Sequence, residues 1–205
     1  MSSVRLAYAL AVCSAIGAGT TSAQSPLVQA ALTHVEGAVY LDDELVVSPS
    51  GGVVLRDYTT VRTAGGRAIV ALKRGGVLAL DEHTLVRVLA NGVYNFNRVE
   101  VLEGTAVVIS DTSAPLVSCR SDAQLSSNGS FRFDVQRIGE TVTCRFRVYD
   151  GAAAVPLVSV ISALRAGQAM SLDPTCGDMI PTMTFEPERM DDFDRWSRQH
   201  TDSRR

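Results

Sequence analysis

Apolar and polar residues alternate in short runs along the chain, which is the period of a β-strand with one buried face. The alternation has no slip at residues 131–136 and 144–148, where phenylalanine, cysteine or valine takes every second position. A turn segment around Gly139 separates these runs, so we expect an antiparallel hairpin whose apolar side chains share a core. Glycine-rich turns also separate further predicted strands, at residues 67–72, 77–80 and 84–89.

An acidic residue followed by glycine and then by small or β-branched residues occurs three times, with the glycines at Gly37, Gly104 and Gly151. Glycine accepts the positive φ that a tight reversal or bulge requires, and the residues after it suit a pleated surface. Short strands about ten residues apart are typical of all-β folds. We therefore predict an all-β roll or sandwich of short antiparallel strands with a short C-terminal helix.

The alternation stops after Pro181, and residues 186–197 are predicted to form this helix. Pro187 and nearby acidic residues suit a helix N-terminus. Met190, Phe193 and Trp196, the only tryptophan, fall within one broad apolar face. Either the helix packs on the protein's own β body, or it binds a partner with Trp196 as the anchor.

The N-terminal 23 residues have the pattern of a secretory signal peptide. Arg5 precedes an apolar run, and small residues end at Ala23, where we predict cleavage. The apolar run has about a dozen residues, short of the roughly 20 that span a bilayer. An uncleaved anchor and lipidation at Cys13 are the alternatives. Later apolar runs are interrupted within about ten residues, so we expect an exported chain without a transmembrane segment after cleavage.

Charge gives no reason to expect a nucleic-acid partner, because the chain carries 19 basic and 22 acidic residues. The basic residues are almost all arginines, and they are scattered along the predicted strands. Solvated strand faces explain that scatter. The alternative is an anion-binding site formed by Arg132, Arg145 and Arg147 on neighbouring strands, since guanidinium groups bind carboxylate or phosphate in a bidentate manner.

Three cysteines remain after the predicted signal peptide. Cys119 and Cys144 each alternate with an inward-facing apolar residue, so we predict a disulfide between them. Buried free thiols are the alternative. Cys176 lies in a predicted loop and is expected to be free or intermolecular. The absence of a C-x-x-C motif argues against redox catalysis and structural zinc.

No catalytic constellation is evident in the sequence. The three histidines, His34, His83 and His200, have no convincing partner along the chain and are predicted to be solvated. The acidic residues from 191 to 194 match no calcium-loop spacing. The acidic pairs at residues 42–44 and 81–82 are typical of polar turns. We therefore predict no enzyme activity, no cofactor and no metal site.

Residues 37–109 resemble the FecR domain. The resemblance is carried by the Glu36-Gly37 unit, by Leu55-Arg56-Asp57, by the threonine, double glycine and alternating strand within residues 61–72, by residues 76–80, and by the Glu103-Gly104 unit. A second, more degenerate copy follows and ends near residue 172. These copies divide the chain into a β domain at residues 24–112, a second β unit at 113–180 and a tail at 181–205.

The resemblance implies a β-rich protein of the cell envelope. The best-known family members relay a signal from an outer-membrane receptor to a cytoplasmic sigma factor, and they carry a cytoplasmic segment and a transmembrane helix before this domain. Here the predicted signal peptide leads straight into the β units. We therefore expect a periplasmic or secreted, non-catalytic module that binds envelope proteins through a strand edge or the Trp196 segment. A sensor of small anions or glycans is the second candidate function, and regulation of a sigma factor is the third.

Overall fold

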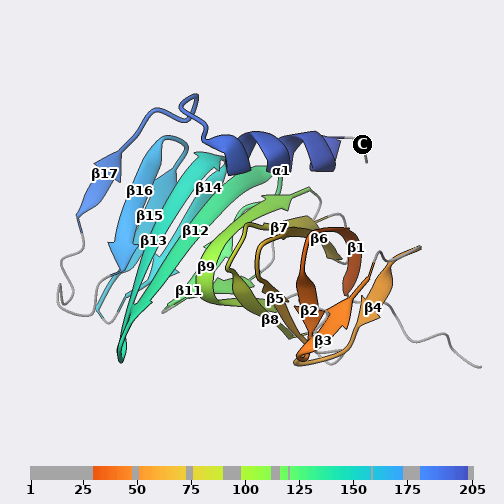
Figure 1. Cartoon of the computed structure of the whole chain (residues 1–205). Helices are drawn as coiled ribbons and strands as arrows, with labels where there is room; N and C mark the ends of the chain where they lie inside the picture. The colour runs from red at the N-terminus through yellow and green to blue at the C-terminus, as the bar shows by residue number, and fades with distance from the viewer. Residues whose placement is uncertain are drawn as a thin grey trace, which may run out of the picture.

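The computed structural model describes residues 30–47, 51–72, 76–89, 98–111, 116–119, 121–157, 159–172 and 181–202. These residues form β-strands with one C-terminal helix, so the predicted all-β fold class is confirmed (Figure 1). The predicted signal peptide, with Cys13, and the loop with Cys176 lie outside the described residues. None of the helical segments described is long and apolar enough to span a bilayer.

The strands form two hydrogen-bonded sheets. Sheet A is antiparallel throughout, and its order is β4 (Val53–Leu55), β1 (Ala30–Glu36), β6 (Arg67–Leu72), β7 (Gly76–Leu80), β9 (Arg98–Ser110), β12 (Gly129–Ile138), β13 (Thr141–Asp150), β16 (Gln168–Leu172) and β17 (Thr182–Thr184). Sheet B has the order β3 (Glu44–Val46), β2 (Val39–Leu41), β5 (Thr60–Thr63), β8 (Leu85–Leu89), β9, β10 (Leu116–Ser118), β11 (Asp122–Leu125), β14 (Ala152–Pro156) and β15 (Ile161–Arg165). The β9–β10 pair is parallel.

Strand β9 belongs to both sheets. Its first half pairs with β8 and β10 in sheet B, and its second half pairs with β7 and β12 in sheet A. The change of sheet falls at Gly104, which has a φ of +88°. A Cβ atom at this position would lie 2.5 Å from the Cα atom of Thr84, so only glycine fits.

The other two acid-glycine units occupy equivalent corners. The chain leaves β1 of sheet A and enters β2 of sheet B at Gly37, and it leaves β13 of sheet A and enters β14 of sheet B at Gly151. Both glycines have positive φ, at +67° and +84°. The predicted need for positive φ is therefore confirmed, and its structural role is to turn the chain from one sheet into the other.

One hydrophobic cluster draws buried side chains from both sheets. The predicted antiparallel hairpin is formed by β12 and β13, with Phe133 opposite Phe146 and Val135 opposite Cys144, and it contributes to this cluster. The rings of Phe133 and Phe146 stack with centroids 4.6 Å apart. The predicted inward-facing residues of the hairpin are all buried.

The predicted disulfide between Cys119 and Cys144 is confirmed. Cys119 directly follows β10 of sheet B, whereas Cys144 lies within β13 of sheet A. The bond therefore fastens the two sheets together across the core. It closes a loop with a sequence separation of 25 residues.

Helix α1 (Asp192–Asp202) lies across the face of sheet A that points away from the main core (Figure 1). Beneath it, Ile69 of β6, Ala79 of β7 and Val107 of β9 form a second apolar cluster with Phe193 and Trp196. Sheet A is thus apolar on both faces along its central strands. The alternation of these strands places one set of side chains in the main core and the other set under the helix.

The helix begins later than the sequence predicted, at Asp192 instead of near residue 186. The Asp191 carboxylate accepts a hydrogen bond from the Asp194 backbone N–H at 2.9 Å, and the Asp194 carboxylate accepts one from the Asp191 N–H at 3.3 Å. This reciprocal pair is a capping box, which satisfies two free N–H groups of the first turn. The backbone at residues 186–190 forms turns instead.

Candidate functional site

Two groups of charged side chains lie on the helix-covered face of sheet A, which we define as its outward-facing side chains beneath and beside α1. The sequence did not predict that these side chains would come together. The main group centres on Arg132 of β12, whose side chain is only 8% exposed. Its Nε donates to Asp134 Oδ1 at 2.9 Å, and its Nη1 donates to Asp191 Oδ2 at 2.6 Å and to Asp194 Oδ1 at 2.9 Å. These ion pairs tie the strand to the start of the helix.

The charges around Arg132 shift pKa values in a consistent way. Burial lowers the pKa of the Arg132 guanidinium, but the Asp134 and Asp194 carboxylates outweigh burial and raise it overall. Burial also raises the pKa of Asp191, and the hydrogen bonds from the Asp194 backbone and from Arg132 outweigh that effect and lower it. Both shifts favour the charged forms of Arg132 and Asp191.

Tyr149 completes this network from β13. Its hydroxyl donates to Asp194 Oδ2 at 2.9 Å. Burial, and after it the negative charge of Asp194, raises the pKa of Tyr149 to about 12. Both carboxylate oxygens of Asp194 thus accept hydrogen bonds from the sheet, which allows this carboxylate of α1 to be buried between the helix and the sheet.

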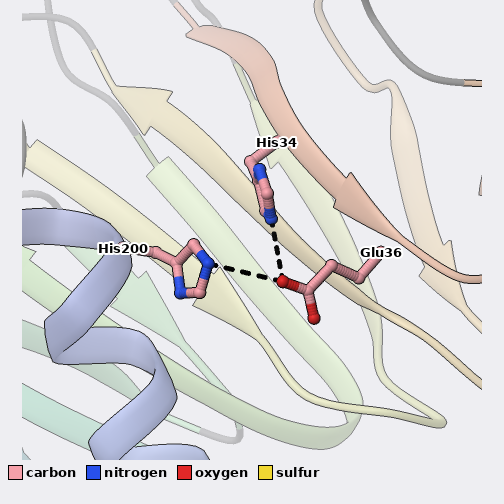
Figure 2. A group of neighbouring side chains, drawn as sticks. All are labelled: His34, Glu36 and His200. Carbon is pink, nitrogen blue, oxygen red and sulfur yellow. Dashed lines mark hydrogen bonds and ion pairs between the residues drawn. The ribbon is translucent and has the colours of Figure 1, made fainter.

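A second group of polar side chains lies where β1 meets the helix. His34 and Glu36 lie two residues apart on β1, and His200 lies on α1; Figure 2 shows the three side chains pointing toward one another. His34 Nε2 is 3.0 Å from Glu36 Oε1, and His200 Nε2 is 3.3 Å from the same oxygen. We call these three residues the His-Glu-His cluster.

Trp196 fixes the orientation of this cluster. Its indole Nε1 donates to both oxygens of Glu36, at 3.0 Å each, and its backbone carbonyl lies 2.9 Å from His200 Nδ1. Burial raises the pKa of Glu36, but the hydrogen bonds from His34 and Trp196 and the positive field of the histidines lower it overall. Glu36 is therefore a carboxylate near neutral pH, in contact with two imidazoles.

Arg67 lies between the two charged groups. It sits opposite Glu36 in the β1–β6 register, and its Nε donates to Asp81 Oδ1 at 2.9 Å. Its guanidinium carbon is 5.5 Å from the Trp196 ring centroid and 5.7 Å from that of Phe193, within the range of cation–π attraction. Asp81 therefore balances the charge that Arg67 brings beside the His-Glu-His cluster.

Two of the three arginines predicted to bind an anion, Arg132 and Arg147, donate to the same carboxylate, that of Asp134. Arg132 is held under the helix by the carboxylates described above, whereas Arg147 donates to Asp134 Oδ2 at 2.6 Å and Arg145 is exposed. Arg145 and Arg147 line a surface hollow of about 510 Å³, together with Gly104, Thr105, Asp134, Val135, Gln136, Thr143 and Ser171. An anion site at Arg145 and Arg147 stays a prediction.

The residues predicted to bind a partner are largely buried within the protein. Phe193 is 2% exposed and Trp196 is 8% exposed, and Met190 is half-buried in the turn before the helix. This burial favours the alternative in which the helix packs on the protein's own β body. Partner binding through Trp196 stays a prediction, and it would require the helix to leave the sheet.

The acidic residues that were predicted to lie in polar turns have hydrogen-bond partners on neighbouring strands. Asp42 accepts hydrogen bonds from the backbone and hydroxyl of Thr60, and Asp81 pairs with Arg67. His83 is exposed at a turn with a φ of +54°. The absence of enzyme activity stays a prediction.

Sequence reasoning missed the His-Glu-His cluster. His34 and Glu36 are two residues apart on a strand, which puts both side chains on one face, and this signal is visible in the sequence. His200 lies on a helix at the other end of the chain, and no local pattern connects it to β1. Only the packing of α1 over sheet A brings it to Glu36.

Comparison with known proteins yields similarity of fold. No protein-family model matches the chain, and no curated protein matches it. Two crystal structures, both described as a "putative anti-sigma factor" from Parabacteroides distasonis ATCC 8503, are similar. One has a TM-score of 0.50 and 21% identity over 62% of this chain and 60% of that chain. The other has a TM-score of 0.51 and 20% identity over 63% and 61%. The match thus spans about three fifths of those chains, and what this chain shares with them is the fold.

Proposed function

We propose that this chain is an exported, non-catalytic β module that binds another protein of the cell envelope and acts there as a regulatory or signalling accessory. Three observations support the proposal: the predicted signal peptide, the resemblance of residues 37–109 to the FecR domain, and the similar fold of proteins described as anti-sigma factors. Regulation of a sigma factor is the narrower form of this role. The identity of the captured partner would decide whether that narrower form applies.

The exposed apolar side chains of two edge strands carry the proposal. Strand β3 ends sheet B and strand β4 ends sheet A, in the part of the chain that the structure describes. Leu45 of β3 and Val54 of β4 are more than half exposed, and Val47, just after β3, is 81% exposed. An edge strand with free backbone groups and apolar side chains can accept a strand from a partner. We therefore assign partner binding to the β3–β4 rim, defined by Leu45, Val47 and Val54.

Crosslinking in the native envelope tests this assignment. The tagged full chain is crosslinked and compared with a Leu45→Asp, Val54→Asp variant, because two carboxylates on the rim would oppose docking of an apolar partner. Ile138→Asp is the matched control, since Ile138 is 74% exposed at the tip of the β12–β13 hairpin. We expect a discrete envelope protein to be captured by the wild type and by the control, and to be lost from the rim variant. Capture of nothing specific by any of the three would contradict the proposal.

A second candidate function is favoured by the hollow at Arg145 and Arg147. Two guanidinium groups beside hydroxyl and amide side chains suit a small anion or an acidic glycan. Arg145 is the better residue to change, because Arg147 also holds Asp134. If this candidate is right, Arg145→Gln weakens binding of a small dicarboxylate or a uronic-acid disaccharide in calorimetry, while Arg137→Gln, at an exposed position on β12, does not.

A further inference from the structure

We propose that His34, Glu36 and His200 bind a divalent transition-metal ion of the zinc class, which would fasten helix α1 to strand β1. The sequence predicted solvated histidines and no metal site. The proposal rests on the geometry of the His-Glu-His cluster and is independent of the partner-binding function proposed above. Its three residues lie on β1 and α1, and none of them belongs to the β3–β4 rim.

The donor atoms are already gathered at distances that suit one ion. Each residue offers one ligand atom, and these atoms lie within 4.8 Å of one another. An ion with bonds of about 2.0–2.1 Å in tetrahedral geometry holds its ligands about 3.3 Å apart. The distances from Glu36 Oε1 to the two imidazole nitrogens, 3.0 and 3.3 Å, match that spacing. The two imidazole nitrogens lie within 4.8 Å of each other, so one of the partly exposed rings would have to turn toward the ion for both to bind it.

The tautomer of His200 supplies the second argument. Its Nδ1 lies 2.9 Å from the Trp196 carbonyl oxygen, which can only accept a hydrogen bond, so Nδ1 carries the hydrogen. In the neutral ring Nε2 then has a lone pair, and this lone pair faces a carboxylate oxygen at 3.3 Å (Figure 2). Two electron-rich atoms in this arrangement repel each other unless a metal ion, or a proton on Nε2, lies between them. Metal-binding histidines usually donate their other ring N–H to a carboxylate, a backbone carbonyl or water, as His200 does here.

The surroundings support the site in three further ways. Trp196 Nε1 donates to both Glu36 oxygens and so fixes the carboxylate toward the histidines, as hydrogen-bond donors behind a metal ligand do. The nearby Arg67 is paired with Asp81, so its charge is balanced. All three ligands are partly exposed, with 30% to 45% of their side-chain surface accessible. The ion can therefore enter from solvent and keep water in its remaining positions.

The ligand set selects the class of ion. Two imidazole nitrogens and one carboxylate oxygen suit Zn²⁺ and the neighbouring ions Co²⁺, Ni²⁺ and Cu²⁺. Ca²⁺ and Mg²⁺ prefer sets made entirely of oxygen ligands. We therefore assign the site to Zn²⁺ and use Co²⁺ as its spectroscopic probe.

Metal titration of the full mature chain, stripped with a chelator, tests the proposal. We expect Zn²⁺ to bind with one-to-one stoichiometry in calorimetry and Co²⁺ to develop visible absorption bands. His200→Asn and, separately, His34→Asn should each weaken Zn²⁺ binding by at least about 10-fold to 100-fold, which is the loss typical even for a residue that only hydrogen-bonds a ligand. His83→Asn is the matched control, because His83 is an exposed histidine outside the cluster. It should leave the affinity unchanged.

Far-UV circular dichroism and Trp196 fluorescence establish whether each variant is folded. If His200→Asn does not fold, His34→Asn still tests the proposal. Zn²⁺ affinity that is the same in the wild type, His34→Asn and His200→Asn would overturn the proposal. So would the absence of Zn²⁺ binding to the wild type, which would leave a proton on His200 Nε2 as the cation facing Glu36. An equal loss of binding in His83→Asn would overturn it as well.

Discussion

At the scale of single residues, Gly104 is a position that has no room for a side chain. Its φ is +88°, and an added Cβ atom would approach the Thr84 Cα at 2.5 Å and the His83 carbonyl oxygen at 2.6 Å. Both are backbone atoms, so relief would require the turn before β8 to move. A residue with a Cβ atom loses about 1–2 kcal/mol of stability when it adopts positive φ, and the steric clash at Gly104 would add to this loss. We expect Gly104→Ala to lower the free energy of unfolding by about 3 kcal/mol in urea denaturation.

Gly139 provides the control for this prediction. It also has positive φ, at +62°, but nothing lies within 4 Å of an added Cβ atom. Gly139→Ala should therefore cost only the conformational term, about 1 kcal/mol. Equal losses for the two substitutions would show that the corner at Gly104 can relax and that close packing does not demand glycine there.

Tyr149 makes a prediction for alkaline pH. Its pKa is raised from 10.0 in the unfolded chain to about 12 in the folded protein, first by burial and then by Asp194. The unfolded chain therefore loses this proton first as the pH rises, so stability is intact below about pH 10 and falls between pH 10 and 12. In an absorbance titration of phenolate, one tyrosine should ionise near pH 12 in the wild type and be missing from Tyr149→Phe. Ionisation of all tyrosines near pH 10 would contradict the assignment.

Local residue patterns predicted some of these features and missed others. The inward positions of Phe131, Phe133 and Cys144 follow from alternation, because burial on a strand depends on its period of two. The same rule places Arg132 on the outer face, where it would be solvated if nothing covered sheet A. The structure buries it under α1. A helix from the far end of the chain provides this cover, and no local pattern carries that information.

At the scale of elements, helix α1 is a structural lid on sheet A. Trp196 is 8% exposed and packs with Phe193 against Ile69, Ala79 and Val107. Truncating a buried tryptophan typically costs about 3–5 kcal/mol. We expect Trp196→Ala to reduce the free energy of unfolding by that amount, measured by circular dichroism in urea. Loss of the indole donor to Glu36 contributes to the same change.

Gln199→Ala is the control for this substitution, because Gln199 is exposed on the same helix, and it should change stability by less than about 0.5 kcal/mol. The two roles considered for Trp196 give opposite results. A tryptophan that serves only as an anchor for a partner could be removed with little loss of stability. If Trp196→Ala were as stable as the wild type, the result would favour the alternative in which the helix binds a partner through Trp196.

The existence of this helix was predictable, but its first residue was not. Pro187 and the acidic residues after it suited an earlier start. The observed cap depends on Asp191 and Asp194 bonding to each other's backbone, and on Arg132 of β12 binding both carboxylates. A tertiary contact thus selected one of two locally acceptable starts, which is why the boundary moved by about one and a half turns.

At the scale of the whole molecule, the disulfide fastens sheet A to sheet B. Cys119 and Cys144 were paired correctly from sequence because both side chains were expected to face one core. In the chain-entropy model, a bond that closes a loop of 25 residues stabilises the fold by about 3 kcal/mol. We expect the Cys119→Ala, Cys144→Ala double variant to lose that amount in urea denaturation. Adding a reductant should destabilise the wild type and leave the double variant unchanged.

Cooperativity of unfolding tests how the chain is divided. The sequence predicted two β units, at residues 24–112 and 113–180. In the structure, strand β9 belongs to both sheets, and a single hydrophobic cluster contains Leu32 and Val70 of the first unit with Phe131 and Phe146 of the second. Neither unit can unfold without exposing the side chains of the other, so we expect a single transition.

Two probes in one urea titration measure this cooperativity. Trp196 fluorescence reports the helix over β6, β7 and β9, whereas far-UV circular dichroism reports the strands of both units. Coincident curves with the disulfide intact would mean that the repeated corners at Gly37, Gly104 and Gly151 build one folding unit. Two separated curves would mean that the two units on either side of the predicted boundary near residue 112 unfold independently. In that case the shared core would contribute less to the stability of the fold than the contacts within each unit do.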